Sequence, residues 1–472
     1  MPIFESGYRD DKEFDAEKKS VEEEIKRFKD IIYAGRIYEC IESLEEMLLT
    51  CYDNEFYEDG LFFAQQLIEI SPYNSEYWLR KGNFLNGIFK FEQALQCYNT
   101  ALSLNPCDAE ILVDKAIAEE NLGLYKTAKE TLQMALNSDP KNDEAAFSLG
   151  ILLQKAEEFE EAVKMFSKII EIDKEYAEAY YELGFCYENL GRLSEALEAY
   201  DKFLDLEPYN ANGWYNRGIV LGRSNMLEKA IDSYDLAIAL REDFSSAWFN
   251  KGNALADLGR FQQAIECFFK SYKIDPSDEA SCYNIANIYE ELGDLHKAIK
   301  FYSEAVRVNG EYYEAYLARG YCYDSIGKYQ LALKDFNRAI SLSRENADAW
   351  YAKADLEYSL GKVQEAVVCY KEAVKIEPDN FEIWYNLAET LLEMGDWINA
   401  KNAFNQCIRI NPDDAASYYG KAKVNFILSK TQDAVECLKY AFSIDPGIRA
   451  EFAKEYPEIK SSKLFKKLLG EF

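Results

Sequence analysis

Small and aromatic residues recur along the chain at intervals of 34 residues. The sequence can be laid in eleven rows of 34 that need no insertion or deletion, starting at residues 75, 109, 143, 177, 211, 245, 279, 313, 347, 381 and 415 and ending at Ile448. The twentieth residue of every row is alanine, from Ala94 to Ala434, and the eighth is always glycine or alanine. Such regular recurrence predicts an array of similar structural units.

Each row reads as two amphipathic helices joined by a turn. The twenty-fourth residue is Tyr or Phe in nine rows, and the fourth position holds five of the six tryptophans. Glycine occupies the fifteenth position in seven rows, where it separates the two helical segments. Proline occupies the thirty-second position in seven rows, where it blocks continuation of the second helix. A row therefore predicts a helix–turn–helix unit in which small residues let the two helices approach each other.

These residues at these positions resemble the pattern of the tetratricopeptide repeat family, and the resemblance covers about four-fifths of the chain. It implies an all-α fold, a right-handed superhelical solenoid of helix-turn-helix tetratricopeptide repeats. The predicted divisions are an N-terminal helical cap (1–40), a degenerate repeat (41–74) in which Gly60 replaces the invariant alanine, eleven repeats (75–448) and a C-terminal capping helix (449–472). The ends of a solenoid are expected to differ because their outer faces have no neighbour.

The sequence departs from the family pattern at the seventh position, which is often leucine in the family. Here it is Lys or Arg in seven rows, for example Arg217 and Arg319. A long aliphatic stem can cover apolar surface while its charge reaches water, so we expect these charges to be exposed.

Charge limits the partners that the chain can attract. The formal net charge is −31 at pH 7, which repels polyanions and argues against nucleic acid and anionic membranes as partners. No run of residues approaches the length of a membrane span, and the first residues are acidic where a signal peptide is basic and then apolar. We therefore expect a cytoplasmic location.

Most of the eleven cysteines are expected to be core residues. They include no CxxC pair, and six of them fall at only two positions of the rows. Helical periodicity places these two positions, the tenth and the twenty-third, beside the packed faces. We therefore predict reduced, buried thiols, which suit a reducing compartment.

One face of each first helix is the candidate binding surface. Positions 4, 7, 8 and 11 of a row lie on one side of that helix, and positions 2, 5, 6, 9, 12 and 13 lie on the other. In proteins that resemble this one, the second set lines the concave surface of the superhelix and holds an extended peptide. The predicted peptide-binding residues belong to it: Asn212, Tyr215, Asn216, Phe249, Asn250, Asn253, Tyr283, Asn284, Asn287, Tyr385 and Asn386.

The asparagines at the sixth position suggest a way of holding a peptide backbone. An asparagine amide offers a donor and an acceptor, which match the N–H and C=O of one peptide unit. The series resembles the asparagine ladder in the peptide-binding superhelix of O-linked N-acetylglucosamine transferase, and the matching residues are Asn216, Asn250, Asn284 and Asn386. Ala318 and Ala352 interrupt the series. The other interpretation is that these amides bridge neighbouring helices, and for the aromatic residues at the fifth position we favour packing between repeats.

The remaining sequence indicates no catalytic chemistry. It holds no phosphate-binding glycine loop, no zinc-ligand spacing and no metalloprotease helix, so we predict no enzyme activity, no cofactor and no metal. The second position is acidic in seven rows, and no residue at the second or fifth position is basic, which argues against the family's carboxylate clamp for chaperone C-terminal tails. The predicted function is a protein-protein interaction scaffold that binds an extended, neutral-to-basic peptide segment in its concave groove.

Two alternatives remain open at this stage. The chain could recruit substrates for a separate enzyme. It could also act as a membrane-peripheral assembly factor through the C-terminal segment SSKLFKKLLGEF, in which apolar residues alternate with lysines. That segment suits a helix that caps the last repeat, or an amphipathic helix that touches a membrane or the acidic groove.

Overall fold

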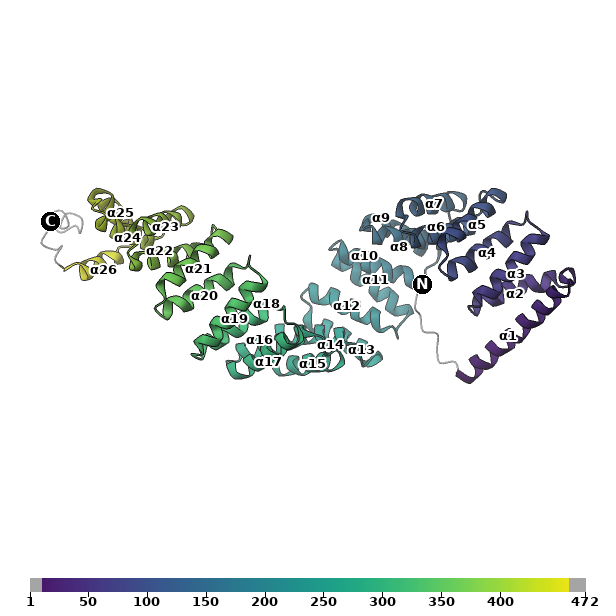
Figure 1. Cartoon of the computed structure of the whole chain (residues 1–472), viewed down its shortest axis with the longest axis horizontal. Helices are drawn as coiled ribbons and strands as arrows, with labels where there is room; N and C mark the ends of the chain where they lie inside the picture. The colour runs from purple at the N-terminus through teal and green to yellow at the C-terminus, as the bar shows by residue number, and fades with distance from the viewer. Residues whose placement is uncertain (1–10, 458–472) are drawn as a thin grey trace. The chain divides into compact units, whose positions relative to one another are not determined.

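The computed structural model describes the backbone of residues 11–457 and the side chains of residues 18–457. Within that range it contains 26 α-helices and one short 3-10 helix, and no strand (Figure 1). The predicted all-α fold of helix-turn-helix repeats is therefore confirmed. The chain divides into two compact units, Met1–Leu240 and Arg241–Phe472, and each is described by itself. The right-handed superhelix concerns the whole chain and stays a prediction.

In the first unit, three α-helices and the 3-10 helix η1 precede five helix pairs. The bounds are α1 (Asp11–Tyr33), η1 (Ile37–Glu39), α2 (Ile41–Asp53), α3 (Tyr57–Ile70), α4 (Ser75–Gly87), α5 (Phe91–Leu104), α6 (Ala109–Asn121), α7 (Tyr125–Ser138), α8 (Asp143–Lys155), α9 (Phe159–Ile172), α10 (Ala177–Asn189), α11 (Leu193–Leu206), α12 (Ala211–Arg223) and α13 (Leu227–Leu240). The repeat that starts at residue 75 consists of α4 and α5, and each later pair forms the next repeat.

In the second unit, six helix pairs precede a short final helix. The bounds are α14 (Ser245–Asp257), α15 (Phe261–Ile274), α16 (Glu279–Glu291), α17 (Leu295–Val308), α18 (Tyr313–Ser325), α19 (Tyr329–Leu342), α20 (Ala347–Ser359), α21 (Val363–Ile376), α22 (Phe381–Met394), α23 (Trp397–Ile410), α24 (Ala415–Ile427), α25 (Thr431–Ile444) and α26 (Gly447–Glu455). Even-numbered helices from α4 to α24 are thus the first helices of repeats, and odd-numbered helices are the second helices.

The first helices lie on the inner side of the curve within each unit. Successive first helices contact one another directly, as α6 does with α8 and α22 does with α24. Among the described residues, no contact of similar extent joins two successive second helices of the same unit. First helices are therefore closer together than second helices, which makes their free side the concave one.

The helices of a repeat pack closely because the eighth and twentieth positions carry small residues. All eleven alanines at the twentieth position are fully buried. A Cβ added to Gly218 would lie 2.5 Å from the ring of Tyr234, the aromatic residue at the twenty-fourth position of the same repeat. The ring thus fills the space that the absent side chain leaves, as the sequence predicts.

Helix ends are marked by side-chain caps and by left-handed residues. Asn or Asp at the thirty-fourth position accepts a hydrogen bond from the first turn of the next first helix, as Asn210 does from the backbone N–H of Gly213 at 3.0 Å. The seven glycines at the fifteenth position have φ between 69° and 83°, a region that favours glycine. These two devices fix where each helix begins and ends.

The tryptophans at the fourth position tie each first helix to the loop before it. The indole Nε1 of Trp214 donates to the carbonyl of Pro208 at 2.9 Å, and Trp384 makes the same bond to Pro378 at 2.9 Å. The other three tryptophans at this position bond to the carbonyl six residues earlier in the same way. An indole packs like the ring of phenylalanine, and it also donates a hydrogen bond, for which phenylalanine has no group.

The ends of the array contain helices where the sequence predicts terminal units. Helix α1 packs Val21, Ile25 and Ile32 against α2 and α3. In α3, a Cβ on Gly60 would lie 2.2 Å from the ring of Phe84, so a close contact with the next repeat explains the loss of the invariant alanine. At the other end, α26 follows the last repeat, and the predicted amphipathic segment 458–472 lies outside the described residues. The division into caps and repeats stays a prediction.

Nine of the eleven cysteines are buried, as expected for core residues. The residues at the tenth and twenty-third positions are buried: Cys97, Cys186, Cys267, Cys322, Cys369 and Cys437. Burial raises the pKa of the Cys369 thiol to about 12, which disfavours the reactive thiolate. Cys107, in the loop before α6, is exposed.

Candidate functional site

The predicted peptide-binding residues lie on four first helices. Helix α12 carries Asn212, Tyr215 and Asn216; α14 carries Phe249, Asn250 and Asn253; α16 carries Tyr283, Asn284 and Asn287; α22 carries Tyr385 and Asn386. All are partly buried except Asn212, which is exposed. The α12 residues belong to the first unit and the others to the second, so each set is described within its own unit. We call the surface formed by positions 2, 5, 6, 9, 12 and 13 the first-helix face.

Two sixth-position asparagines bridge successive repeats. The side-chain amide of Asn216 donates to the hydroxyl of Tyr181 at 2.9 Å. Asn386 donates to the hydroxyl of Tyr351, also at 2.9 Å. In both pairs the acceptor is the fifth-position tyrosine of the preceding repeat. These amides thus have the bridging role that the sequence left as one of two interpretations.

The ninth-position asparagines act as acceptors within this network. Asn253 accepts from the amide of Asn284 at 2.9 Å, which again joins two repeats. Asn287 accepts from the hydroxyl of Tyr302 at 2.6 Å, and Tyr302 is the core aromatic of the same repeat. Hydrogen bonds of this kind fix the rotamers of the asparagines and keep the face ordered.

The fifth-position aromatic residues pack against the twenty-fourth position of their own repeat. The ring centroids of Phe249 and Phe268 are 5.5 Å apart, and those of Tyr283 and Tyr302 are also 5.5 Å apart. Tyr283 additionally contacts Tyr312, the residue before α18, at 5.1 Å. The expectation of packing between repeats is therefore corrected, because these twenty-fourth-position rings lie in the same repeat.

Carboxylates at the sixth and ninth positions are a feature that the sequence did not reveal. Asp114 and Glu182 lie at the sixth position, and Asp355 and Glu389 at the ninth. Burial raises the pKa of all four. They occupy different columns in different rows, so neither the sixth nor the ninth column is acidic throughout. These acids become apparent only when positions 2, 5, 6, 9, 12 and 13 of all rows are considered together as one surface.

Asp114 has the most strongly perturbed environment of these acids. Its pKa is raised to about 7, mainly by burial and also by the carboxylates of Glu144 and Glu110, whereas Asn83 and Arg80 oppose the rise. Arg80 is itself engaged, because its guanidinium lies 2.7 Å from the carboxylate of Glu76 and 3.6 Å from that of Glu110. One cation therefore faces several carboxylates on this part of the first-helix face.

A second acidic region lies near the end of the second unit. Burial raises the pKa of Glu389. The carboxylates of Glu455 and Glu451 raise it as well, and only Lys423 lowers it. The ammonium of Lys423 lies 2.9 Å from the carboxylate of Glu455, so its charge is shared. Farther along the same face, the hydroxyl of Tyr351 donates to Glu382 at 2.9 Å. Carboxylates outnumber cations here too.

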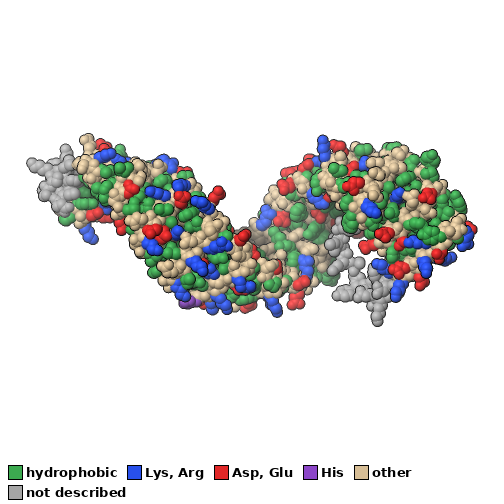
Figure 2. Space-filling view, in the orientation of Figure 1, with side chains coloured by type: hydrophobic (Ala, Val, Ile, Leu, Met, Phe, Trp, Pro, Cys, Tyr) green, Lys and Arg blue, Asp and Glu red, His purple; other side chains and the backbone are tan. Residues whose placement is uncertain are grey.

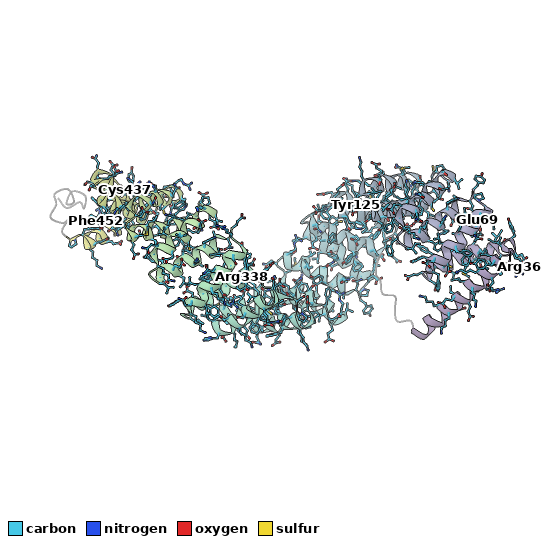
Figure 3. The ribbon with its side chains drawn as sticks, viewed as in Figure 1. Arg36, Glu69, Tyr125, Arg338, Cys437 and Phe452 are labelled. Carbon is cyan, nitrogen blue, oxygen red and sulfur yellow. The ribbon has the colours of Figure 1, made fainter. Side chains whose placement is uncertain are left out.

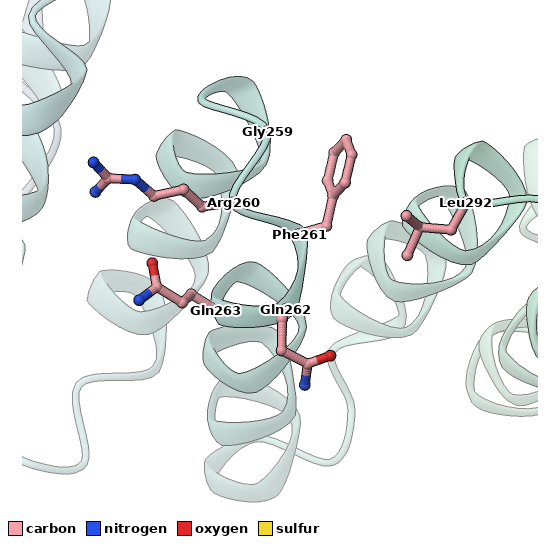
Figure 4. Close-up of a pocket in the computed structure, with 6 residues that line it drawn as sticks. All are labelled: Gly259, Arg260, Phe261, Gln262, Gln263 and Leu292. Carbon is pink, nitrogen blue, oxygen red and sulfur yellow. The ribbon is translucent and has the colours of Figure 1, made fainter.

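Within residues 18–457, no group of three or more His, Cys, Asp or Glu side chains is arranged to hold a metal ion. None of the helices between residues 11 and 457 is long and apolar enough to span a membrane. A shallow recess lies at the α14–α15 turn, where Phe261 and Leu292 from successive repeats face each other (Figure 4).

Comparison with protein families gives repeated matches along the chain. Models described as tetratricopeptide repeat, or TPR repeat, match residues 75–106, 147–211, 211–244, 245–278, 280–312, 313–346, 354–395 and 381–414. These segments cover more than half of the chain. No protein of curated function matches the chain.

Several solved structures are similar to parts of the chain. The crystal structure of YrrB, a TPR protein with an unusual peptide-binding site, is 27% identical and aligns 39% of this chain with 95% of that chain at a TM-score of 0.36. The crystal structure of MamA is 25% identical and aligns 34% with 95% at 0.34. Yeast Tom70 is 16% identical and aligns 90% with 99% at 0.39. All three TM-scores lie below 0.5, so these proteins say nothing about the partner of this chain.

Proposed function

Because the chain belongs to the tetratricopeptide repeat family, we propose that it is a protein-interaction scaffold whose first-helix face binds an extended, neutral-to-basic peptide segment. The observation that carries the proposal is the excess of partly buried carboxylates on that face, in both units. The pKa values of Asp114, Glu182, Asp355 and Glu389 are raised. A raised carboxyl pKa means that the charged form is disfavoured in the free protein, and a cation placed nearby would favour it.

Electrostatic complementarity explains the choice of a basic partner. Lysine or arginine side chains of a bound segment would lie near Asp114 and its neighbours Glu110 and Glu144, where one engaged arginine is the nearby cation. Opposite charges across an interface steer encounter and select the partner. An acidic segment would instead add like charges to this face and be rejected.

The asparagines are proposed to hold the backbone of the segment. An asparagine amide has two N–H donors and a carbonyl oxygen with two lone pairs. The bridges from Asn216 and Asn386 each use one N–H. Their remaining groups are proposed to reach a peptide backbone, together with those of Asn250 and Asn284. The aromatic residues Tyr215, Phe249, Tyr283 and Tyr385 would form the apolar floor between them.

The experiment must separate an acidic face from an acidic protein. Figure 2 shows acidic and basic side chains interspersed over the visible surface of each unit. Three neutralisations on the first-helix face (Asp114→Asn, Glu144→Gln and Glu182→Gln) are therefore compared with three on exposed positions of second helices (Glu130→Gln, Glu171→Gln and Glu198→Gln). Both triple variants change the net charge by the same amount and lie in the first unit.

The probe is a fluorescein-labelled peptide of twelve residues that alternates lysine and serine, titrated into the full chain and followed by anisotropy. The first-helix variant should bind it about tenfold more weakly, a loss of about 1.4 kcal/mol. The second-helix variant should stay within about twofold of the unmodified chain, since distant exposed charges are screened. Equal weakening in both variants would show that net charge alone attracts the peptide, and the proposal would fail.

A further inference from the structure

The fifteenth position of one repeat carries an unusual residue. This position is left-handed throughout the array and is glycine in seven repeats. Among the described residues, five non-glycine residues have positive φ, namely Glu55, Phe89, Glu157, Asn225 and Ser429. Phe89, with a φ of 59°, is the only aromatic or aliphatic residue among them. A bulky residue in this region is an outlier, because its Cβ crowds the backbone.

The side chain of Phe89 adds a second unfavourable feature. It is 79% exposed, although it is a large apolar residue. Its ring contacts Phe91 edge-on, with centroids 6.0 Å apart, and this contact leaves most of the ring in water. Neither the backbone conformation nor the exposure stabilises the fold. Local choices that conflict with stability are expected at functional positions.

The corresponding turn of the next repeat also exposes apolar side chains. Leu124 and Tyr125, at the turn between α6 and α7, are 46% and 56% exposed, and Tyr125 is labelled in Figure 3. Two exposed lysines, Lys90 and Lys126, are adjacent in sequence to these apolar residues, and neither forms an ion pair with a described side chain. We call the surface formed by these residues and Phe91 the turn patch: Phe89, Lys90, Phe91, Leu124, Tyr125 and Lys126.

An ordinary turn of the same array shows what Phe89 changes. At the α14–α15 turn the fifteenth position is Gly259, with a φ of 69°. There Phe261 and Leu292 face each other across a shallow recess, and no side chain projects from the glycine (Figure 4). In the repeat formed by α4 and α5, an aromatic side chain stands at the corresponding place. The α14–α15 turn shows that this kind of turn forms without a side chain at the fifteenth position. The aromatic ring of Phe89 is therefore not needed to make the α4–α5 turn.

We propose that the turn patch is a second docking surface, which binds a protein segment that combines apolar side chains with carboxylates. Exposed apolar groups that gather on a soluble protein mark interaction sites. The two unpaired lysines favour acidic side chains in the same partner, and Glu92 in the first turn of α5 is the nearest carboxylate in sequence. This preference is opposite to that of the first-helix face, so the scaffold could hold two different partners at once.

Other occupants fit the patch less well. A lipid surface would also accept aromatic residues and lysines. However, an anionic bilayer carries negative charge over an extended surface, so the net charge of −31 opposes its approach more strongly than that of a short segment with a few carboxylates. A second copy of the chain would supply acidic side chains, and its binding would be seen as self-association. Both are outcomes that the experiment separates from the proposal.

The test uses the full chain and one variant that improves the fold while removing the proposed contact. Phe89→Gly relieves the left-handed strain, so it should raise the denaturation midpoint, and Glu157→Gly should do the same away from the patch. The probe is a labelled peptide of twelve residues with four glutamates, two leucines, two phenylalanines and four serines. Phe89→Gly should weaken its binding by at least about tenfold, as truncation of an aromatic anchor does. Glu157→Gly should bind it like the unmodified chain.

The lysines and the competing occupants provide the remaining measurements. Lys90→Gln with Lys126→Gln should weaken binding by about fivefold without changing the denaturation midpoint. The proposal is overturned if the probe does not bind saturably, if Phe89→Gly binds it unchanged, or if a probe with lysine in place of glutamate binds equally well. Two other results would also overturn it. The unmodified chain could self-associate in sedimentation, or float with vesicles of anionic phospholipid, and lose that behaviour in Phe89→Gly.

Discussion

The side-chain amide of Asn216 donates to the hydroxyl of Tyr181 at 2.9 Å, across 35 residues of sequence, and so joins α12 to α10. Asn386 and Tyr351 repeat this relationship in the second unit at the same distance. The asparagines of the first-helix face therefore stabilise the array whatever they bind. A side-chain amide can bridge two repeats and also bind a peptide, because the bridge uses only one of its two N–H groups.

A double-mutant cycle should detect this bridge. Asn216→Ala and Tyr181→Phe should each destabilise the repeats around α10 and α12, and the double variant should lose less than the sum, with a coupling of about 1 kcal/mol. Part of the stability that Asn216→Ala loses is regained because alanine is the better helix former. Hydrogen exchange of α10 and α12, followed by mass spectrometry, measures the local stability.

The control for this cycle is Tyr385→Phe. In the repeat after Tyr385 the sixth position is Gly420, which has no side chain to bridge. The hydroxyl of Tyr385 should therefore be worth less to local stability than that of Tyr181. If the stability losses of Asn216→Ala and Tyr181→Phe are additive in the double variant, the hydrogen bond between the two side chains contributes nothing to stability.

The ion pair between Arg319 and Asp335 should be important for stability. Their side chains are only 14% and 5% exposed, and two hydrogen bonds of 2.7 and 2.8 Å join them. Asp335→Ala should destabilise the α18–α19 repeat by about 3 kcal/mol, because it leaves a buried guanidinium without its carboxylate. The matched surface pair is Arg409 and Asp379, with 55% and 78% exposed side chains. Asp379→Ala should cost less than about 1 kcal/mol, and similar losses for the two variants would contradict the assignment.

Left-handed positions outside the turn patch should respond to glycine in a predictable direction. Ser429 has a φ of 62°, so Ser429→Gly should stabilise the last repeat by about 1 kcal/mol. Gly259, with a φ of 69°, is the reverse case, and Gly259→Ala should destabilise its repeat by a similar amount. Gly310→Ala is the control, since its Cβ would meet open space and its φ is not positive. Chemical denaturation curves of the four proteins would show a different order if the turns were not strained.

The pKa of Asp114 predicts a pH dependence. Its pKa is about 7 in the folded chain and about 3.9 in an unfolded one, so the folded state binds more protons between these values. Stability contributed by this group is therefore lost as the pH rises from about 4 through 7. Asp114→Asn should make the α6 region more stable at pH 8, with a smaller gain at pH 5.

The variant also has a precedent within the chain. Asn83 and Asp114 occupy the same two repeat positions as Asn253 and Asn284, whose side chains are bonded at 2.9 Å. Asp114→Asn should therefore keep the contact with Asn83 without the buried charge. Hydrogen exchange at pH 5 and pH 8 measures the effect, and an equal gain at both values would place the cause elsewhere.

The sequence was sufficient for the repeat architecture because the residues that define it act locally. Alanine at the twentieth position, the aromatic residue at the twenty-fourth and glycine at the fifteenth each serve their own repeat or its turn. Because each of these roles is fulfilled within a single repeat, the pattern is visible without a structure. Gly60 shows the limit, since its reason is the ring of Phe84 in the next repeat.

The candidate site was less predictable because it depends on contacts between repeats and on burial. The partner of Asn216 is 35 residues away and belongs to another helix. The acids at the sixth and ninth positions change column from row to row. The expected exposure of seventh-position charges was wrong for Arg319, which is buried against Asp335. Arg217 likewise bonds Asp201 at 2.6 Å, from a helix of the preceding repeat.

Site-specific photocrosslinking tests the central claim most directly. A photoreactive phenylalanine analogue is placed at Tyr385 on the first-helix face or, as the control, at Tyr440, which is 60% exposed on the second helix α25. Each full-length protein is irradiated with the labelled lysine–serine peptide, with and without excess unlabelled peptide. We expect a crosslink from position 385 that unlabelled peptide abolishes, and little crosslinking from position 440. Equal crosslinking from both positions, or crosslinking from position 440 alone, would contradict the assignment of the first-helix face as the peptide-binding surface.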